Sequence, residues 1–123
     1  MLLKNYNLRA SYRIIEYVAA DGTTPFSVWL GRLSDLTARA KILMRIKRAE
    51  LGNLGQYRSV GRGVMELVVD SGPGYRVYFA QGGDDVLLLL AGGSKRSQQR
   101  DISLAHKRWV DFKERSNSKG FGM

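Results

Sequence analysis

The chain has 123 residues, which is enough for one domain with a single hydrophobic core and too few for two. It contains no cysteine, so disulfides, thiolate zinc sites and a cysteine nucleophile are excluded. Lysine and arginine number 20 against 11 aspartates and glutamates, which gives a net charge of +9. Such a charge favours a polyanionic partner, with nucleic acid the first candidate and an acidic protein the second. We expect one domain over residues 1–123, with flexible ends at 1–11 and 116–123.

No segment of the sequence is typical of a secretion signal or a membrane span. The N-terminus, MLLKNYNLRASYR, lacks an apolar run, and the longest apolar run, residues 86–91, is far shorter than the roughly 20 residues that cross a bilayer. We therefore expect a cytoplasmic protein without a membrane partner.

The N-terminal part predicts a strand followed by a helix. Residues 12–19 are rich in β-branched and aromatic side chains, and the Asp21-Gly22 turn signal follows them. Thr24 is a typical N-cap with Pro25 at the first helical position. One apolar stripe follows at helical spacing: Phe26, Trp29, Leu30 and Leu33.

A second helix is predicted from a cap at Ser34 or Asp35 to about Leu51, with Gly52 ending it. Its expected inward residues are Leu36, Ala40, Leu43 and Ile46. Its expected outer face carries the cations Lys41, Arg45 and Arg48. Two helices joined so closely form a hairpin that can lie on one side of a sheet.

The second half predicts antiparallel strands. Residues 56–60 are a candidate edge strand, and the Gly61-Arg62-Gly63 turn precedes a hairpin around Ser71-Gly72-Pro73. Antiparallel pairs keep a constant sum of residue numbers, so Val68 faces Arg76 and Glu66 faces Tyr78 if Asp70 lies opposite Gly74. One face is then apolar, with Leu67, Val69, Val77 and Phe79. The other gathers Glu66, Asp70, Arg76 and Tyr78.

A third apolar strand and a last helix complete the chain. Ser97 caps this helix, which runs to about Arg115 with Ile102, Ala105, Trp109 and Phe112 on its apolar side. The result is an α+β fold: a small antiparallel-rich sheet, an N-terminal helical hairpin on one face, and a C-terminal helix. We expect the helices to pack on the face made by Leu67, Val69, Val77 and Phe79.

Four segments form a combined pattern: TPFSVWLGRL, ARAKILMRIKRAELGN, GPGYRVYF and LLAGGSKRSQQRDI. Together they resemble the RelE/ParE superfamily of bacterial type II toxins, and within it the HigB-like group of addiction module killer proteins, over residues 12–115. The resemblance implies a toxin that is silenced by a cognate antitoxin, often a helix-turn-helix protein. Many such toxins enter the ribosome and cut mRNA, whereas ParE-type members inhibit DNA gyrase and cut nothing.

The resemblance also implies candidate site residues. Arg76 matches the arginine that contacts the scissile phosphate, and Lys95, or less directly Arg96, matches a basic residue before the last helix. Two family features are missing: Glu66 and Val68 stand where lysines are usual, and Asp101 stands where a tyrosine is usual.

The residues themselves suggest further roles, each with a plainer alternative. Glu66 is a candidate general base, although beside Arg76 it would more readily form a structural ion pair. Tyr78 is a candidate for stacking on an RNA base. The remaining candidate RNA-binding cations are Arg58, Lys41, Arg45 and Arg48, which equally suit a solvated surface. His106 is the single histidine, so paired-histidine and multi-histidine metal sites are excluded, and we expect no metal or cofactor.

The leading hypothesis is therefore a ribosome-dependent mRNA endonuclease toxin, with the antitoxin, the ribosome and mRNA as partners. Two alternatives stay open: a non-enzymatic gyrase inhibitor, and a degenerate toxin that only binds its antitoxin.

Overall fold

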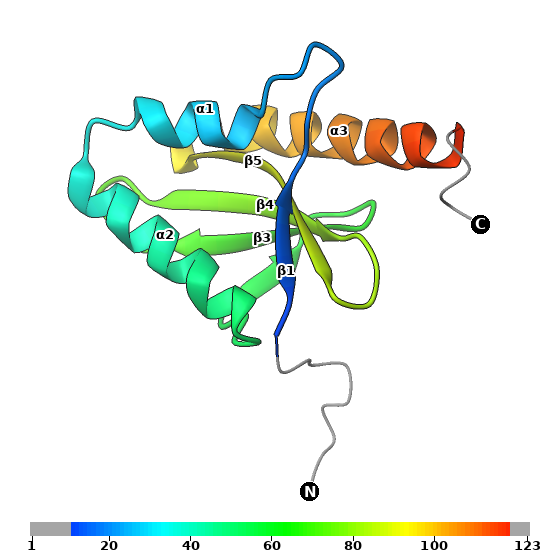
Figure 1. Ribbon diagram of the computed structural model, residues 1–123. Coiled ribbons are helices and arrows are strands. Elements are labelled where there is room, and N and C mark those ends of the chain that lie inside the picture. The colour runs from blue at the N-terminus through cyan, green and yellow to red at the C-terminus, as the bar shows by residue number, and fades with distance from the viewer. Residues whose placement is uncertain (1–10, 119–123) are drawn as a thin grey trace, which may run out of the picture.

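The computed structural model describes residues 11–118, so most of both predicted flexible ends lies outside the described residues. The elements follow in the order β1 (Arg13–Glu16), α1 (Pro25–Arg32), α2 (Leu36–Glu50), β2 (Tyr57–Ser59), β3 (Val64–Val69), β4 (Tyr75–Gln81), β5 (Val86–Ser94), a 3-10 turn (Lys95–Ser97) and α3 (Gln98–Ser118). Figure 1 shows the short connection that joins α1 to α2. The predicted α+β class is confirmed.

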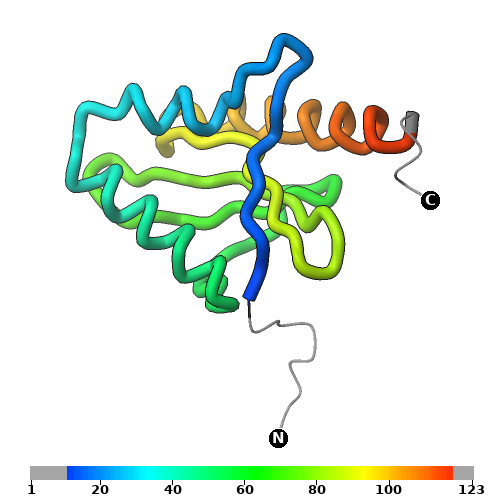
Figure 2. Tube along the Cα trace, viewed as in Figure 1, coloured from blue at the N-terminus to red at the C-terminus, as the bar shows by residue number. Residues whose placement is uncertain are grey.

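The strands of this region form one mixed sheet in the order β1-β5-β4-β3-β2. The first strand, blue in Figure 2, lies beside β5 and runs parallel to it, whereas the other neighbours are antiparallel. The β3–β4 register pairs Glu66 with Tyr78 and Val68 with Arg76, which confirms the prediction. Its turn closes with the Gly74 amide donating to the Ser71 carbonyl at 2.9 Å, and Gly74 takes a φ of +83° that favours glycine.

One face of the sheet is covered by α1 and α2. Leu67, Val69, Val77 and Phe79 are buried there together with Phe26 of α1 and Ile42 of α2, as predicted for that sheet face. Pro25 begins α1 as expected, and the Asp35 carboxylate caps α2 by accepting a hydrogen bond from the Ala38 amide at 3.0 Å. The Thr24 side chain makes no capping hydrogen bond.

The opposite face is covered by α3, which corrects the expectation that all helices pack on one face. Ala105, Ile102, Trp109 and Phe112 of α3 pack there, as the apolar side predicted for this helix, against Val64, Tyr78, Ala80, Leu88 and Leu90. A β-bulge interrupts the pairing of β4 with β5, where Tyr78 lies opposite Ala91 and Phe79 lies opposite Leu89. Because Leu90 is the extra residue, Leu90 and Ala91 both belong to this second cluster although they are consecutive. The sheet is therefore a middle layer, and its supposedly open polar face is largely inside the protein.

Several predicted details are wrong. Leu36, Ala40 and Leu43 are exposed, and α2 instead buries Ala38, Ile42 and Ala49, because that side of the helix joins the core with Leu67 and Val69 of β3. The last helix continues past Arg115 to Ser118, so the start of the expected C-terminal tail is helical. β1 is shorter than the predicted 12–19. None of the helices between residues 11 and 118 combines the length and hydrophobicity that a bilayer span requires.

Candidate functional site

The polar residues of the α3-covered face meet at one buried carboxylate, that of Glu66. The Arg58 Nε donates to its Oε1 at 2.7 Å, and the Gln98 side-chain amide and the Tyr78 hydroxyl donate to its Oε2 at 2.7 and 3.1 Å. The Arg76 Nε lies 3.7 Å from the same Oε2. Groups from β2, β3, β4 and α3 thus converge on one side chain.

Glu66 is a poor general base in this setting. Burial alone would raise the pKa of Glu66, but the hydrogen bonds from Arg58, Gln98 and Tyr78 outweigh burial, and its pKa lies below the usual glutamate value. The side chain is wholly buried and both oxygens already accept hydrogen bonds. The prediction of Glu66 as a proton acceptor is therefore corrected, and the alternative of a structural ion pair holds.

Tyr78 cannot stack on a base as predicted. It is fully buried under α3 beside Val64 and Ala80. Burial, together with the charge of Glu66, raises the pKa of Tyr78, so its hydroxyl stays protonated and donates to that carboxylate. Its role is to support the buried cluster.

Arg76 lies at the margin between this cluster and solvent. Its side chain is 14% exposed, and among the described residues its Nε has no hydrogen-bond partner beyond the long ion pair with Glu66. The guanidinium extends toward the turn before β4: its Nη1 lies 3.3 Å from the point where a Cβ on Gly74 would stand. Because this Nε is itself buried, an anion from solvent could reach only the terminal nitrogens of the guanidinium.

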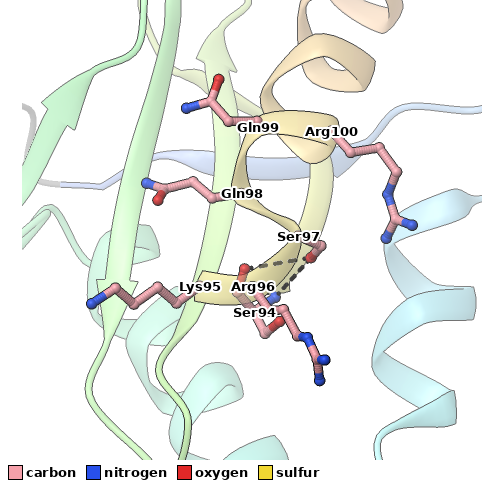
Figure 3. Close-up of a pocket in the computed structure, with 7 residues that line it drawn as sticks. All are labelled: Ser94, Lys95, Arg96, Ser97, Gln98, Gln99 and Arg100. Carbon is pink, nitrogen blue, oxygen red and sulfur yellow. Dashed lines mark hydrogen bonds between the residues drawn. The ribbon is translucent and has the colours of Figure 1, made fainter.

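Basic residues follow β5, the strand that pairs with the strand of Arg76. Arg76 pairs with Gly93 of β5, and the Lys95 amide donates to the Gly74 carbonyl at 3.0 Å, so the backbones of Arg76 and Lys95 are neighbours. Lys95 and Arg96 are exposed and, with Arg100, line an open pocket of about 600 Å³. Figure 3 shows that Lys95 points to the opposite side from Arg96 and Arg100. Lys95 is thus the basic residue of this pocket whose backbone neighbours that of Arg76.

The base of this pocket is held by a small hydrogen-bond network. The Ser97 hydroxyl donates to the buried Asp101 carboxylate, and the Ser94 amide donates to the Ser97 oxygen at 3.3 Å. A Cβ on Gly93 would stand only 1.7 Å from the Asp101 Oδ2. Asp101 therefore lies directly over β5 in the first turn of α3, as predicted, and fixes how the basic segment leaves the sheet.

The other predicted RNA-binding cations are not part of this arrangement. Arg58 does contact the Glu66 cluster, and its side chain is 60% exposed. Lys41, Arg45 and Arg48 are on α2, which covers the other face of the sheet. Arg45 is wrongly predicted as an outer cation: its guanidinium donates to the Leu54 carbonyl at 2.6 Å and the Gln56 carbonyl at 2.7 Å. Lys41 and Arg48 are exposed.

Two contacts escaped prediction. Gln98 reaches Glu66 because α3 crosses the face that was expected to be open, and no local sequence signal indicates this. The His106 Nε2 lies 3.0 Å from the Val60 carbonyl oxygen and 3.1 Å from that of Gly61, so this residue holds the turn after β2. Within residues 11–118 no cluster of three histidine, aspartate or glutamate side chains suits a metal ion.

The chain has a relative among known proteins. No family model matches the chain. A protein of Haemophilus influenzae, described as an uncharacterized protein, is 46% identical over 83 residues, which cover 68% of this chain and 84% of that relative. The chain therefore belongs to the same protein family as this Haemophilus influenzae protein.

Proposed function

We propose that the chain is the toxin component of a bacterial type II toxin–antitoxin system and that it cleaves mRNA on the ribosome. The observation that carries the proposal is the placement of Arg76: its side chain lies at the edge of the buried cluster with 14% of it exposed, and its backbone neighbours that of Lys95, an exposed residue of the open basic pocket. The RelE/ParE resemblance and the net charge of +9 support the same assignment.

In the proposed reaction, the oxygen of a ribose 2′-hydroxyl attacks the adjacent phosphorus and its proton passes to solvent water, while the bond to the 5′-oxygen of the next nucleotide breaks. The products are a 2′,3′-cyclic phosphate and a 5′-hydroxyl end. Arg76 stabilises the negative charge that develops on the phosphate oxygens, because its planar donors match that geometry and stay charged. Lys95 adds a second positive charge and can donate a proton to the leaving oxygen.

Mapping mRNA 5′ ends in cells that express the protein tests this proposal. We expect new ends with the unchanged protein and none with Arg76→Ala. Arg32→Ala is the matched control, since Arg32 is an exposed arginine in the last turn of α1, on another element. Growth arrest with no new mRNA ends would reject cleavage.

One observation favours a second candidate, a toxin that inhibits DNA gyrase without cutting RNA. Glu66 and Tyr78, two of the side chains offered for RNA chemistry, are sequestered in the buried cluster. A supercoiling assay with purified protein separates the candidates: full gyrase activity at excess protein would reject this second one.

A further inference from the structure

Asp101 is a buried carboxylate that the proposed reaction does not use. It lies in the first turn of α3 and is 4% exposed. The helix dipole favours a carboxylate at this end of a helix, but that effect needs no burial, and burying a charge is costly unless hydrogen bonds compensate it. The compensating donor is the Ser97 hydroxyl, which hydrogen-bonds to the Asp101 Oδ2. The helix dipole alone therefore does not account for the buried position of Asp101.

Ser97 and Asp101, here called the Ser97–Asp101 pair, lie over the strand position next to Arg76. A Cβ on Gly93 would stand 1.7 Å from the Asp101 Oδ2 and 2.8 Å from the Ser97 Oγ. Gly93 lies opposite Arg76 in the β4–β5 register, and opposite residues direct their side chains to the same face of a sheet. The pair therefore fills the space of the missing Gly93 side chain, on the face to which Arg76 points.

The same pair fixes the backbone that carries Lys95. The Ser97 oxygen accepts a hydrogen bond from the Ser94 amide at 3.3 Å, which ties the end of the 3-10 turn to its start (Figure 3). On the other side, the Lys95 amide donates to the Gly74 carbonyl at 3.0 Å. The Lys95 backbone is thus held between the turn before β4 and the Ser97–Asp101 pair, whereas its side chain is exposed.

The position of the Lys95 ammonium depends strongly on this backbone. An ammonium is a single point charge on a flexible stem, without the planar donors that align an arginine on a phosphate. The start of the Lys95 side chain therefore determines whether its ammonium reaches a phosphate at Arg76. A displacement of about 1 Å at a reacting group can lower a rate on the order of 100-fold.

We propose that Asp101, acting through Ser97, is a positioning residue for Lys95. The Ser97–Asp101 pair holds the 3-10 turn so that the Lys95 ammonium reaches the leaving 5′-oxygen of the phosphate bound at Arg76. Neither member of the pair contacts RNA. The inference rests on the proposed function and assigns to that reaction two residues that do not touch the substrate.

Steady-state cleavage by the purified full chain on mRNA-programmed ribosomes tests the inference. Ser97→Ala removes the hydroxyl and should lower kcat about tenfold, with KM within about twofold of the unchanged protein because Arg76 still binds the phosphate. Ser97→Thr keeps a hydroxyl and should restore most of the rate. Asp101→Asn keeps an acceptor oxygen but loses the charge, and should lower kcat about threefold. Ser103→Ala is the matched control, since Ser103 is an exposed serine of α3, and should cut at the unchanged rate.

A double-mutant cycle with Lys95→Ala separates positioning from a general effect on the fold. If Ser97 acts through Lys95, Ser97→Ala should have no further effect on kcat in the Lys95→Ala protein, whereas independent effects would multiply. Multiplied effects, or a Ser97→Ala rate equal to that of the unchanged protein, would overturn the inference and leave the proposed function intact. Absence of cleavage by the unchanged protein would overturn the proposed function, and this inference with it.

Discussion

Replacing Glu66 with glutamine removes the charge on which the polar cluster is built while keeping its shape. The amide that replaces one carboxylate oxygen is a donor, and it faces groups that are themselves donors: Arg58, Tyr78 and Gln98. Arg76, whose side chain is 14% exposed, loses its nearby counter-charge. We expect this single change to disturb β2, β3, β4 and α3 together.

The expected cost follows from the burial of the pair. Removing one partner of a buried ion pair costs about 3 to 5 kcal/mol, and we take about 3 kcal/mol because part of the cluster reaches solvent. With an m-value of about 1.5 kcal/mol/M, the urea midpoint of unfolding should fall by about 2 M. Tyr78→Phe removes only one donor and should cost about 1 kcal/mol.

Urea unfolding followed by circular dichroism measures both variants. The reasoning is refuted if Glu66→Gln costs no more than Tyr78→Phe, because the carboxylate would then act as a single hydrogen-bond acceptor and not as the centre of the cluster. An unchanged m-value in both variants verifies that the comparison reports stability.

Three further predictions concern the fold. The lowered pKa of Glu66 means that the folded protein binds fewer protons than the unfolded chain, so stability should fall as the pH drops below about 4.5, and acid titration should show a weaker fall in Glu66→Gln. Gly93→Ala should cost at least about 2 kcal/mol in thermal unfolding because the new methyl group meets a buried carboxylate of α3, whereas Gly31→Ala, with open space in α1, should gain up to about 1 kcal/mol. Arg45→Gln should cost about 2 kcal/mol through two lost hydrogen bonds, and Lys41→Gln almost nothing; equal stability of these two variants would contradict the assigned role.

The β3–β4 pairing and most of the helices were predictable because local signals agreed with one another, whereas the parallel pairing of β1 with β5 was not predicted. In the β3–β4 hairpin, apolar alternation and the Gly-Pro-Gly turn both specify the register that places Glu66 opposite Tyr78. Pro25 and Asp35 mark where α1 and α2 begin. These signals depend on residues close in sequence, so one chain is enough to interpret them.

The face of α2 that packs on the sheet was not predictable because the helix has two apolar stripes. Leu36, Ala40 and Leu43 make a stripe as convincing as that of Ala38 and Ile42, and only the packing of the folded core, in which Ala38, Ile42 and Ala49 are buried, decides between them. Periodicity alone identifies an apolar side; it cannot rank two of them.

Three residues of the candidate site could be predicted to lie together, whereas Gln98 and the burial of the cluster could not. Glu66, Arg76 and Tyr78 were expected to gather on one face, and they do. α3 covers this face through contacts between residues far apart in the sequence. These contacts are made by Gln98 and by apolar residues of α3 that would have suited either face. A polar face was therefore mistaken for an open one.

Cleavage by purified protein on mRNA-programmed ribosomes tests the central proposal most directly, with Arg76→Lys as the variant, because lysine keeps the charge and loses the planar donors. We predict cleavage by the unchanged protein, at a rate similar to that of Arg32→Lys, and a rate on the order of 100-fold lower for Arg76→Lys at a similar thermal midpoint. A folded Arg76→Lys protein that cuts as fast as the unchanged one would contradict the account.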